Sequence, residues 1–195
     1  MRRLLIIAVA LSTVSCSSAG DPTTTTLDTT TTTMAEPSTS TSTTVPPPFG
    51  VTSPAFVDGA EIPTQFTCDG ADISPELNIV GIPEETQSLV IIADDPDAPL
   101  GTWDHWVEYD IPSEAGSRDI ASGAADLGLA GVNSWKLEGY MGPCPPQGEQ
   151  HTYHFRVYAL GGFLDLPPGV DSEAVRTAMT DLLVDDVELT GVYAR

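Results

Sequence analysis

The side chains of this chain that are best suited to bind or transform a ligand gather in two short stretches. One runs from Asp95 to His105, and the other begins at Gly142 and contains the remaining two of the three histidines. This clustering predicts a single site. Because the chain has 28 acidic and only 7 basic residues, convergent histidines, an aspartate and a Gly/Pro-rich loop predict a small pocket for an anion, to which histidine can donate hydrogen bonds.

Alternation along the expected strands brings these residues together. In the strand that begins at His105, the odd-numbered positions form one apolar face, made of His105, Val107, Tyr109 and Ile111. In a second strand, His151 and Tyr153 share a face and His154 points away from it. Asp95 ends a third strand, in the same parity as the odd-numbered apolar residues of that strand. We therefore expect these strand ends to contribute to one pocket.

The donors in these stretches could hold an oxyanion without any arginine. Tyr153 offers a hydroxyl, and His105 and His151 each offer a ring N–H. The Gly-Pro-Cys-Pro-Pro loop that starts at Gly142 adds backbone amides, that of Gly142 among them, with little side chain in the way. Asp95 is expected to accept a hydrogen bond from a histidine, which fixes its tautomer and favours the imidazolium, or to bind the ammonium end of a zwitterionic ligand.

The N-terminus predicts export. Arg2 and Arg3 precede the apolar run Leu4–Leu11, and small residues then lead to Cys16, so we expect residues 1–15 to be a signal peptide. The apolar run is too short to span a bilayer. The residues before Cys16 resemble the lipobox of bacterial lipoproteins, which implies that Cys16 becomes the lipidated N-terminus at the extracellular face of the cell membrane. Ordinary secretion is the alternative.

The composition divides the rest of the chain in two. Residues 16–48 are rich in Thr, Ser and Pro and have too few apolar side chains to offset the entropy of ordering their backbone, so we expect a disordered linker after the lipidated cysteine. Such tracts resemble the O-glycosylated stalks of exported proteins, and a plain flexible tether is the alternative. Residues 49–195 have the composition of one folded domain.

The net charge limits the partners. Removal of residues 1–15 leaves five basic residues against 28 acidic ones, which makes nucleic acid an unsuitable partner. The same field repels anionic lipid surfaces at long range. Any anion must therefore be held by local donors, with an affinity that depends on screening by salt.

The expected export assigns different roles to the three cysteines. Cys16 is assigned to the lipid, which leaves Cys68 and Cys144 for a disulfide, with two separate buried thiols as the alternative. An enzyme would need a nucleophile beside a base, and Cys144 with His151 is the candidate pair. Because a disulfide and two flanking prolines would block Cys144, we expect no enzymatic activity.

A metal site is a further alternative. His105, His151 and Asp95 form a set of two histidines and one carboxylate that could bind a transition metal. Nothing else in the sequence supplies the outer hydrogen-bond partners that such sites use, so we expect neither a metal nor another cofactor.

Most of the folded part is predicted to be β-strand. Residues 88–93 form a continuous apolar run, 106–111 alternate, and 153–160 are aromatic and β-branched, each closed by turn residues. A helix is predicted after a cap at Asp171, with apolar residues at helical spacing: Val175, Met179, Leu182 and Leu183. A strand pattern returns over 187–193. The architecture should be a β-sandwich or a large antiparallel sheet with a helix packed on it.

Several short motifs then match a known pattern in order. They are Cys68-Asp69-Gly70, Asp95-Pro96-Asp97-Ala98-Pro99, His105-Trp106-Val107, Asn133-Ser134-Trp135, Gly142-Pro143-Cys144-Pro145-Pro146 and His151-Thr152-Tyr153. These motifs closely resemble the phosphatidylethanolamine-binding protein family, in particular its bacterial Raf-kinase-inhibitor-like branch, and the resemblance covers residues 49–195. Two positions differ, because Thr152 stands where the family usually has Arg and Lys136 where it has a small residue.

The resemblance implies a mainly β fold with a large central antiparallel sheet, a smaller flanking sheet, a C-terminal helix and a shallow pocket at the sheet ends. By motif position, the ligand-binding residues would be Asp95, His105, Gly142, Pro143, His151 and Tyr153. The expected function is that of an exported, membrane-tethered binding protein for small phosphate-type anions or phosphorylated head groups. The alternative is an inhibitor or regulator of a secreted enzyme that acts through protein–protein contact.

Overall fold

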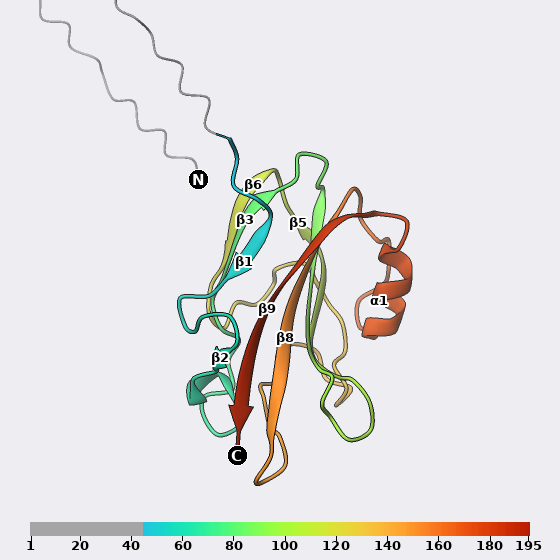
Figure 1. Cartoon of the computed structure of the whole chain (residues 1–195). Coiled ribbons are helices and arrows are strands. Elements are labelled where there is room, and N and C mark those ends of the chain that lie inside the picture. The colour runs from blue at the N-terminus through green and yellow to red at the C-terminus, as the bar shows by residue number, and fades with distance from the viewer. Residues whose placement is uncertain (1–44) are drawn as a thin grey trace, which may run out of the picture. The chain divides into compact units, whose positions relative to one another are not determined.

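The structure is a computed structural model that describes residues 45–195. The expected signal peptide, Cys16 and most of the linker lie outside the described residues. Within the described part, the chain forms two sheets and one α-helix (Figure 1). No helix in residues 45–195 is long and apolar enough to cross a membrane.

The larger sheet has six strands, as expected for the large central sheet. Its strand order is β2 (Ala60–Glu61), β9 (Leu183–Ala194), β8 (Gln150–Leu160), β4 (Ser88–Asp95), β5 (Trp103–Pro112) and β7 (Leu129–Ala130). Neighbouring strands are antiparallel except for the short β2, which runs parallel to β9. The sheet is therefore antiparallel over its four inner strands β9, β8, β4 and β5, which are also its longest.

The smaller sheet and the helix cover opposite faces of the larger sheet (Figure 1). The smaller sheet contains β1 (Gly50–Thr52), β3 (Leu77–Ile82) and β6 (Gly116–Ile120) in the order β1-β3-β6, all antiparallel. A short 3₁₀-helix, η1, spans Thr64–Phe66, and α1 spans Ser172–Met179. This mainly β architecture with two sheets and a late helix agrees with the fold class expected from the sequence.

The core lies in two layers, one on each face of β4. Leu89 and Ile91 pack with the smaller sheet, whereas Val90 and Ile92 pack on the side of α1. Every residue of β4 is buried, which is why this segment is an unbroken apolar run and not an alternating one.

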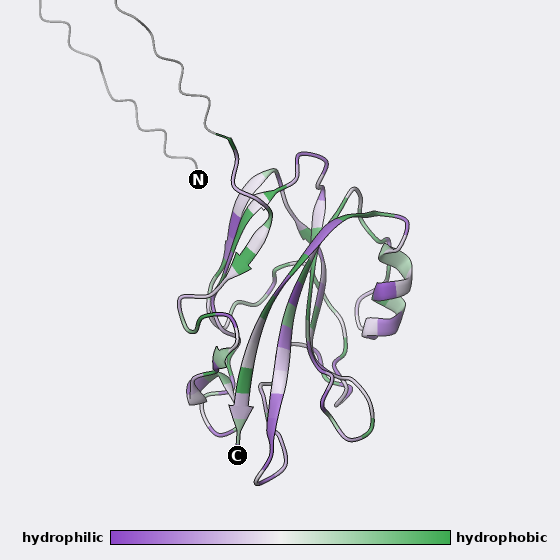
Figure 2. Cartoon of the chain, viewed as in Figure 1, coloured by the Kyte–Doolittle hydropathy of each residue, from purple (hydrophilic) through white to green (hydrophobic). Residues whose placement is uncertain are grey.

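The helix begins where the sequence indicated. The side chain of Asp171 accepts a hydrogen bond from the backbone N–H of Ala174 (3.1 Å) and so caps the first turn. The helix carries both hydrophobic and hydrophilic residues (Figure 2), and Val175 and Met179 are buried against the sheet. The expectation for Leu182 and Leu183 was wrong, because α1 ends at Met179 and Leu183 pairs with Leu160 and begins β9.

The expected face of β5 was wrong because two β-bulges interrupt its alternation. Asp94 pairs with Asp104 and Ala93 pairs with Trp106, so His105 is an extra residue on β5. A second irregularity places two residues of β5 opposite Val90, and one of them, Asp110, has a φ of +53°.

The bulges decide which side chains share a face. Trp106 and Ile111 pack in the core layer of the smaller sheet, whereas Val107 and Tyr109 pack in the layer of α1. The ring of His105 lies 5.3 Å from that of Tyr153, on the side of the smaller sheet. His105 therefore does not share the face of Val107 and Tyr109. The β-bulge at His105 turns its ring toward Tyr153.

Candidate functional site

A cavity of about 290 Å³ opens at the edge of the large sheet where β4 ends and β5 and β8 begin. Three of the expected ligand-binding residues line it, namely Asp95, His105 and His151. The complete lining is Asp95, Ala98, Pro99, Leu100, Trp103, His105, Trp135, Cys144, Pro145, Pro146 and His151. The structure therefore brings together polar groups from three strands inside largely apolar walls.

His151 is held between two carboxylates. Its Nδ1 lies 2.7 Å from Asp95 Oδ2, and its Nε2 lies 3.2 Å from Glu149 Oε2. Asp95 is held in turn, because its Oδ1 accepts a hydrogen bond from the backbone N–H of Asp97 (2.9 Å). Burial lowers the pKa of His151, but the hydrogen bonds to Asp95 and Glu149 outweigh it and raise that pKa above its ordinary value. This geometry favours the imidazolium.

His105 has the opposite electrostatics. Its Nδ1–H donates to the backbone carbonyl of Met141 at 2.7 Å, which fixes the tautomer and leaves Nε2 as the nitrogen available to a ligand. Burial lowers the pKa of His105, although the Met141 carbonyl and the charge of Asp95 act against this shift. Near neutral pH the cavity thus holds one imidazole that is readily protonated and one that resists protonation.

Tyr153 packs against both histidines and is not among the residues that line the cavity. Its ring meets that of His105 edge-on at 5.3 Å and stacks against that of His151 at 6.4 Å. The buried hydroxyl has no hydrogen-bond partner among the described residues, and burial and the charge of Asp95 raise its pKa. The position of Tyr153 suits a residue that orients both imidazole rings.

Gly142 and Pro143 also lie outside the cavity lining. The backbone N–H of Gly142 donates to Asp72 Oδ1 (2.6 Å), so the amide expected to meet an anion is already occupied. A Cβ at this position would lie 2.2 Å from the carbonyl oxygen of Phe66, so only glycine fits there. The Pro143 carbonyl accepts from the backbone N–H of Cys68 (3.2 Å). Both residues shape the loop rather than touch the cavity.

The loop is also tied covalently. Cys68 and Cys144 form a disulfide, as the sequence predicted, across a separation of 76 residues. Because Cys144 lines the cavity, the bond fixes one wall of it. A bonded Cys144 has no thiolate to offer as a nucleophile. Within residues 45–195, no group of three or more His, Cys, Asp and Glu side chains is arranged to hold a metal ion.

Sequence reasoning missed two aromatic residues of the cavity. The rings of Trp103 and Trp135 meet edge-on at 5.3 Å, and that of Trp135 lies 5.1 Å from the ring of His105. The indole Nε1 of Trp103 is buried and has no partner among the described residues. Glu149 was missed as well, although its place two residues before His151 puts the two side chains on one face of β8 and its approach.

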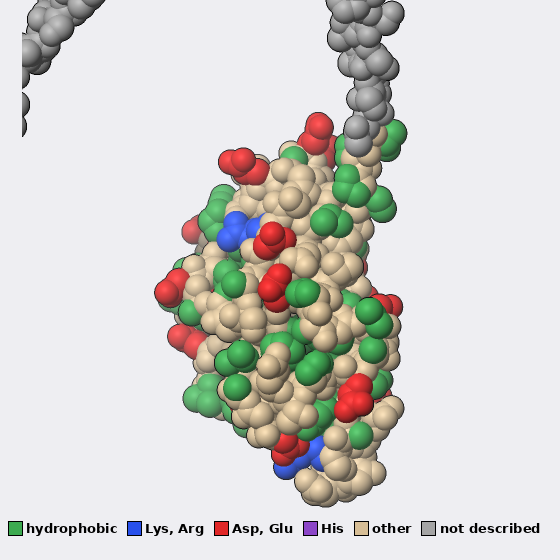
Figure 3. All heavy atoms as spheres, turned by 90° about the vertical axis from the view of Figure 1, so that its left-hand side faces the viewer, with side chains coloured by type: hydrophobic (Ala, Val, Ile, Leu, Met, Phe, Trp, Pro, Cys, Tyr) green, Lys and Arg blue, Asp and Glu red, His purple; other side chains and the backbone are tan. Residues whose placement is uncertain are grey.

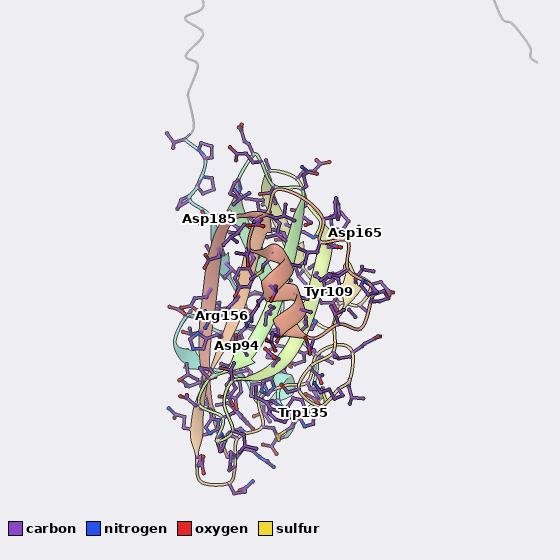
Figure 4. All side chains as sticks on the ribbon, turned by 90° about the vertical axis from the view of Figure 1, so that its right-hand side faces the viewer. Asp94, Tyr109, Trp135, Arg156, Asp165 and Asp185 are labelled. Carbon is purple, nitrogen blue, oxygen red and sulfur yellow. A yellow bond between two sulfur atoms is a disulfide. The ribbon has the colours of Figure 1, made fainter. Side chains whose placement is uncertain are left out.

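His154 lies on the opposite face of the sheet, where its Nδ1 is 3.1 Å from Glu188 Oε2. A second cavity of about 680 Å³ lies on that face, between the sheet and α1. There, Asp94 Oδ2 accepts from Arg156 Nε at 3.1 Å and from an Arg176 guanidinium N–H at 2.7 Å. Figure 4 shows Asp94 and Arg156 beside the helix.

Comparison with known proteins gives one consistent result. A family model described as phosphatidylethanolamine-binding protein matches residues 52–194. The UPF0098 protein of Methanothermobacter thermautotrophicus is 44% identical over 147 residues, which cover 72% of this chain and 95% of that protein. The UPF0098 protein of Aquifex aeolicus is 43% identical over 150 residues, which cover 74% of this chain and 88% of that protein.

Two solved structures are similar to this chain. A phosphatidylethanolamine-binding protein homologue from Chlamydia trachomatis has a TM-score of 0.71 and 36% identity, and the match covers 76% of this chain and 98% of that one. YbcL of E. coli, described as a member of the mammalian PEBP family, has a TM-score of 0.69 and 29% identity, with 75% and 98% covered.

Proposed function

The chain belongs to the phosphatidylethanolamine-binding protein family and is a binding protein of that kind, and on this premise we propose that its cavity binds small phosphate-type anions or phosphorylated head groups. One observation carries the proposal. Two imidazoles from different strands, those of His105 and His151, line the same cavity of about 290 Å³, and Asp95 supports the charged form of His151.

The cavity offers donors that suit an oxyanion. His151 presents Nε2–H when it is an imidazolium, and His105 presents Nε2–H once it is protonated, because its Nδ1 is committed to Met141. The unpartnered indole N–H of Trp103 lies in the same wall. The apolar lining lowers the local dielectric constant, which strengthens each of these charge-assisted hydrogen bonds.

The charge of the whole protein opposes an anion. The face shown in Figure 3 carries several scattered acidic side chains and few basic ones. Affinity must therefore come from short-range hydrogen bonds, and salt that screens the surrounding carboxylates should not weaken binding as it does at a basic site. Phosphate and phosphorylethanolamine are the first ligands to test.

The test is calorimetry of the full-length protein with each of these two compounds at several pH values. Binding that strengthens as pH falls through the histidine range would support the proposal, because an anion and a proton on imidazole stabilise each other. Phosphate affinity that rises with pH would count against the proposal, and a metal titration whose affinity rises with pH would favour ligation by neutral imidazole. We propose that the protein has no catalytic activity and needs no cofactor.

We also propose that the protein acts from the extracellular face of the cell membrane. The support is the sequence of residues 1–15, the lipobox-like approach to Cys16 and the Thr/Ser/Pro-rich segment behind it. Replacement of Cys16 by Ser should release the protein into the medium. Mass spectrometry of the wild-type N-terminus decides between a lipidated Cys16 and an unmodified start elsewhere, which would indicate ordinary secretion.

A second candidate function rests on the rim of the cavity. Leu100 is 92% exposed and Trp135 is 37% exposed, and both line the opening. Exposed apolar side chains around a pocket suit contact with another protein, so the protein could inhibit or regulate a secreted enzyme. Loss of such inhibition in Leu100→Ser, with phosphate binding intact, would favour this function over ligand binding.

A further inference from the structure

Glu149 stands out among the acidic residues near the cavity. Its side chain is 54% exposed, yet its Oε2 lies 3.2 Å from Nε2 of His151, whose side chain is only 5% exposed. The backbone on either side of this contact is fixed, because the Glu149 N–H donates to Pro146 (3.1 Å) and its carbonyl accepts from Arg195 (3.2 Å). An exposed carboxylate is thus held against a buried imidazole that faces the cavity.

The two nitrogens of His151 are not equally available to a ligand. Nδ1 is bonded at 2.7 Å to Asp95, whose side chain is 5% exposed and is itself held by the backbone of Asp97. Removal of that partner would leave an uncompensated buried charge. Nε2–H is therefore the ring donor left for a ligand, and the carboxylate of Glu149 occupies it.

We propose that Glu149 is a tethered competitor of the anionic ligand, one that binds the Nε2–H of His151 when the cavity is empty and must leave when an anion enters. This inference rests on the proposed function of the cavity. A single N–H cannot be shared fully between two acceptors, so the ligand oxygen has to replace the carboxylate oxygen. The exposed side chain of Glu149 can return to water at small expense, whereas the buried Asp95 cannot.

The competition lowers the apparent affinity for every anion that uses this donor. The ligand must displace the carboxylate of Glu149 from the Nε2–H of His151, and a displaced carboxylate that stays near the bound anion repels it. Glu149→Gln keeps the size of the side chain but removes its charge, so the amide oxygen is a weaker acceptor for the Nε2–H and does not repel the anion as a carboxylate does. We expect this variant to bind inorganic phosphate roughly three- to tenfold more tightly than the wild type. The gain should shrink at high salt.

The experiment is calorimetry of the full-length protein with inorganic phosphate at about pH 5.5, below the ordinary histidine pKa of about 6.5, where the imidazolium of His151 is favoured. Glu84→Gln is the matched control, because Glu84 is an exposed carboxylate in the turn between β3 and β4. It should bind phosphate as the wild type does. Glu149→Asp keeps the charge on a shorter side chain and should fall between the wild type and Glu149→Gln.

An NMR titration of His151 provides a readout that a structural role alone would not move. Glu149→Gln should lower the pKa of His151, since one of its two carboxylate partners is lost while Asp95 remains. Equal or weaker phosphate binding by Glu149→Gln at pH 5.5 overturns the competitor and leaves the anion site standing. Absence of phosphate binding in both proteins overturns the anion site and this inference together.

Discussion

Two adjacent aspartates at the end of β4 lie on opposite faces of the large sheet and have different cationic partners. Asp94 accepts from Arg156 and Arg176 on the side of α1. Asp95 accepts from His151 on the side of the cavity. Both carboxylates are nearly inaccessible to water, with side chains 4% and 5% exposed. Each buried charge is thus compensated, as the cost of burying it requires.

The difference lies in what the partners can do. An arginine keeps its charge at any pH at which the protein is folded, and Arg176 reaches the sheet from α1, so the Asp94 cluster ties the helix in place. Histidine can lose its proton near neutral pH. The Asp95 pair therefore forms a site whose charge can change and whose outer nitrogen is within reach of a ligand. The same carboxylate chemistry supports structure on one face and recognition on the other.

The largest effect on stability should come from loss of the disulfide, which constrains the face of the cavity. Among the described residues, the face of α1 has no such bond. Cys144→Ser opens a disulfide that joins residues 76 apart, and the chain-entropy model gives about 4 kcal/mol for a loop of this length. Denaturant unfolding measures the loss. Phosphate affinity should fall too, because Cys144 is part of the wall. Native protein in which both thiols react with a labelling reagent without reduction would contradict the bond itself.

The next largest effect should separate ligand residues from their neighbours. Loss of one charge-assisted hydrogen bond removes about 1.5 to 3 kcal/mol, so His151→Ala or His105→Ala should weaken phosphate binding by roughly ten- to a hundredfold. Tyr153→Phe should weaken it less, since its hydroxyl does not line the cavity. His154→Ala, on the other face, is the control and should do little. Equal affinity of the wild type and His151→Ala would remove the anion site.

The sequence was sufficient to predict that Asp95, His105 and His151 come together. Each of these residues lies at the end of a segment with a clear strand pattern, and the ends of neighbouring strands meet at the same edge of a sheet. The sequence also predicted the disulfide, since export leaves two cysteines to pair. It could not predict why His105 faces the cavity, because a bulge depends on how β5 registers against β4 and not on β5 alone. An aspartate that tolerates positive φ, such as Asp110, was the only local signal of the second bulge.

Long-range contacts account for what the sequence could not predict about the other expected site residues. The Gly142 amide was expected to meet a ligand, but Asp72, which is 70 residues away, accepts its hydrogen bond. Tyr153 was placed on the correct face by alternation, yet its absence from the lining of the cavity depends on how the neighbouring segments pack. A pattern of period two gives the face of a residue and says nothing of its distance from the surface.

A smaller effect should come from the arginine face. Arg176→Met removes one of the two partners of Asp94 and the hydrogen bond to the Tyr158 hydroxyl (2.8 Å). Since Arg176 is about one third exposed, solvent screening limits the loss to about 1 to 2 kcal/mol of unfolding free energy. Phosphate binding should be unchanged, and a change would indicate that the two faces are coupled.

The smallest expected effect compares the two histidines of the cavity through the pH dependence of stability. The pKa of His151 is raised in the folded protein, so its contribution is fully present below the unfolded value of about 6.5 and is lost as pH rises through the folded pKa. The pKa of His105 is lowered by burial. Its contribution is present above about pH 6.5 and is lost as pH falls through the folded pKa, because the folded state resists the proton. Relative to the wild type, His151→Gln should therefore lose most stability at acid pH, and His105→Gln should gain relative stability there.

Denaturant unfolding of the three proteins from pH 5 to 9 measures this difference, and NMR should show His151 titrating above His105. Added phosphate should raise both pKa values, since a bound anion stabilises each imidazolium. If the two histidines titrate together and phosphate moves neither, the contrast between a site that changes charge and a permanent ion-pair cluster does not hold.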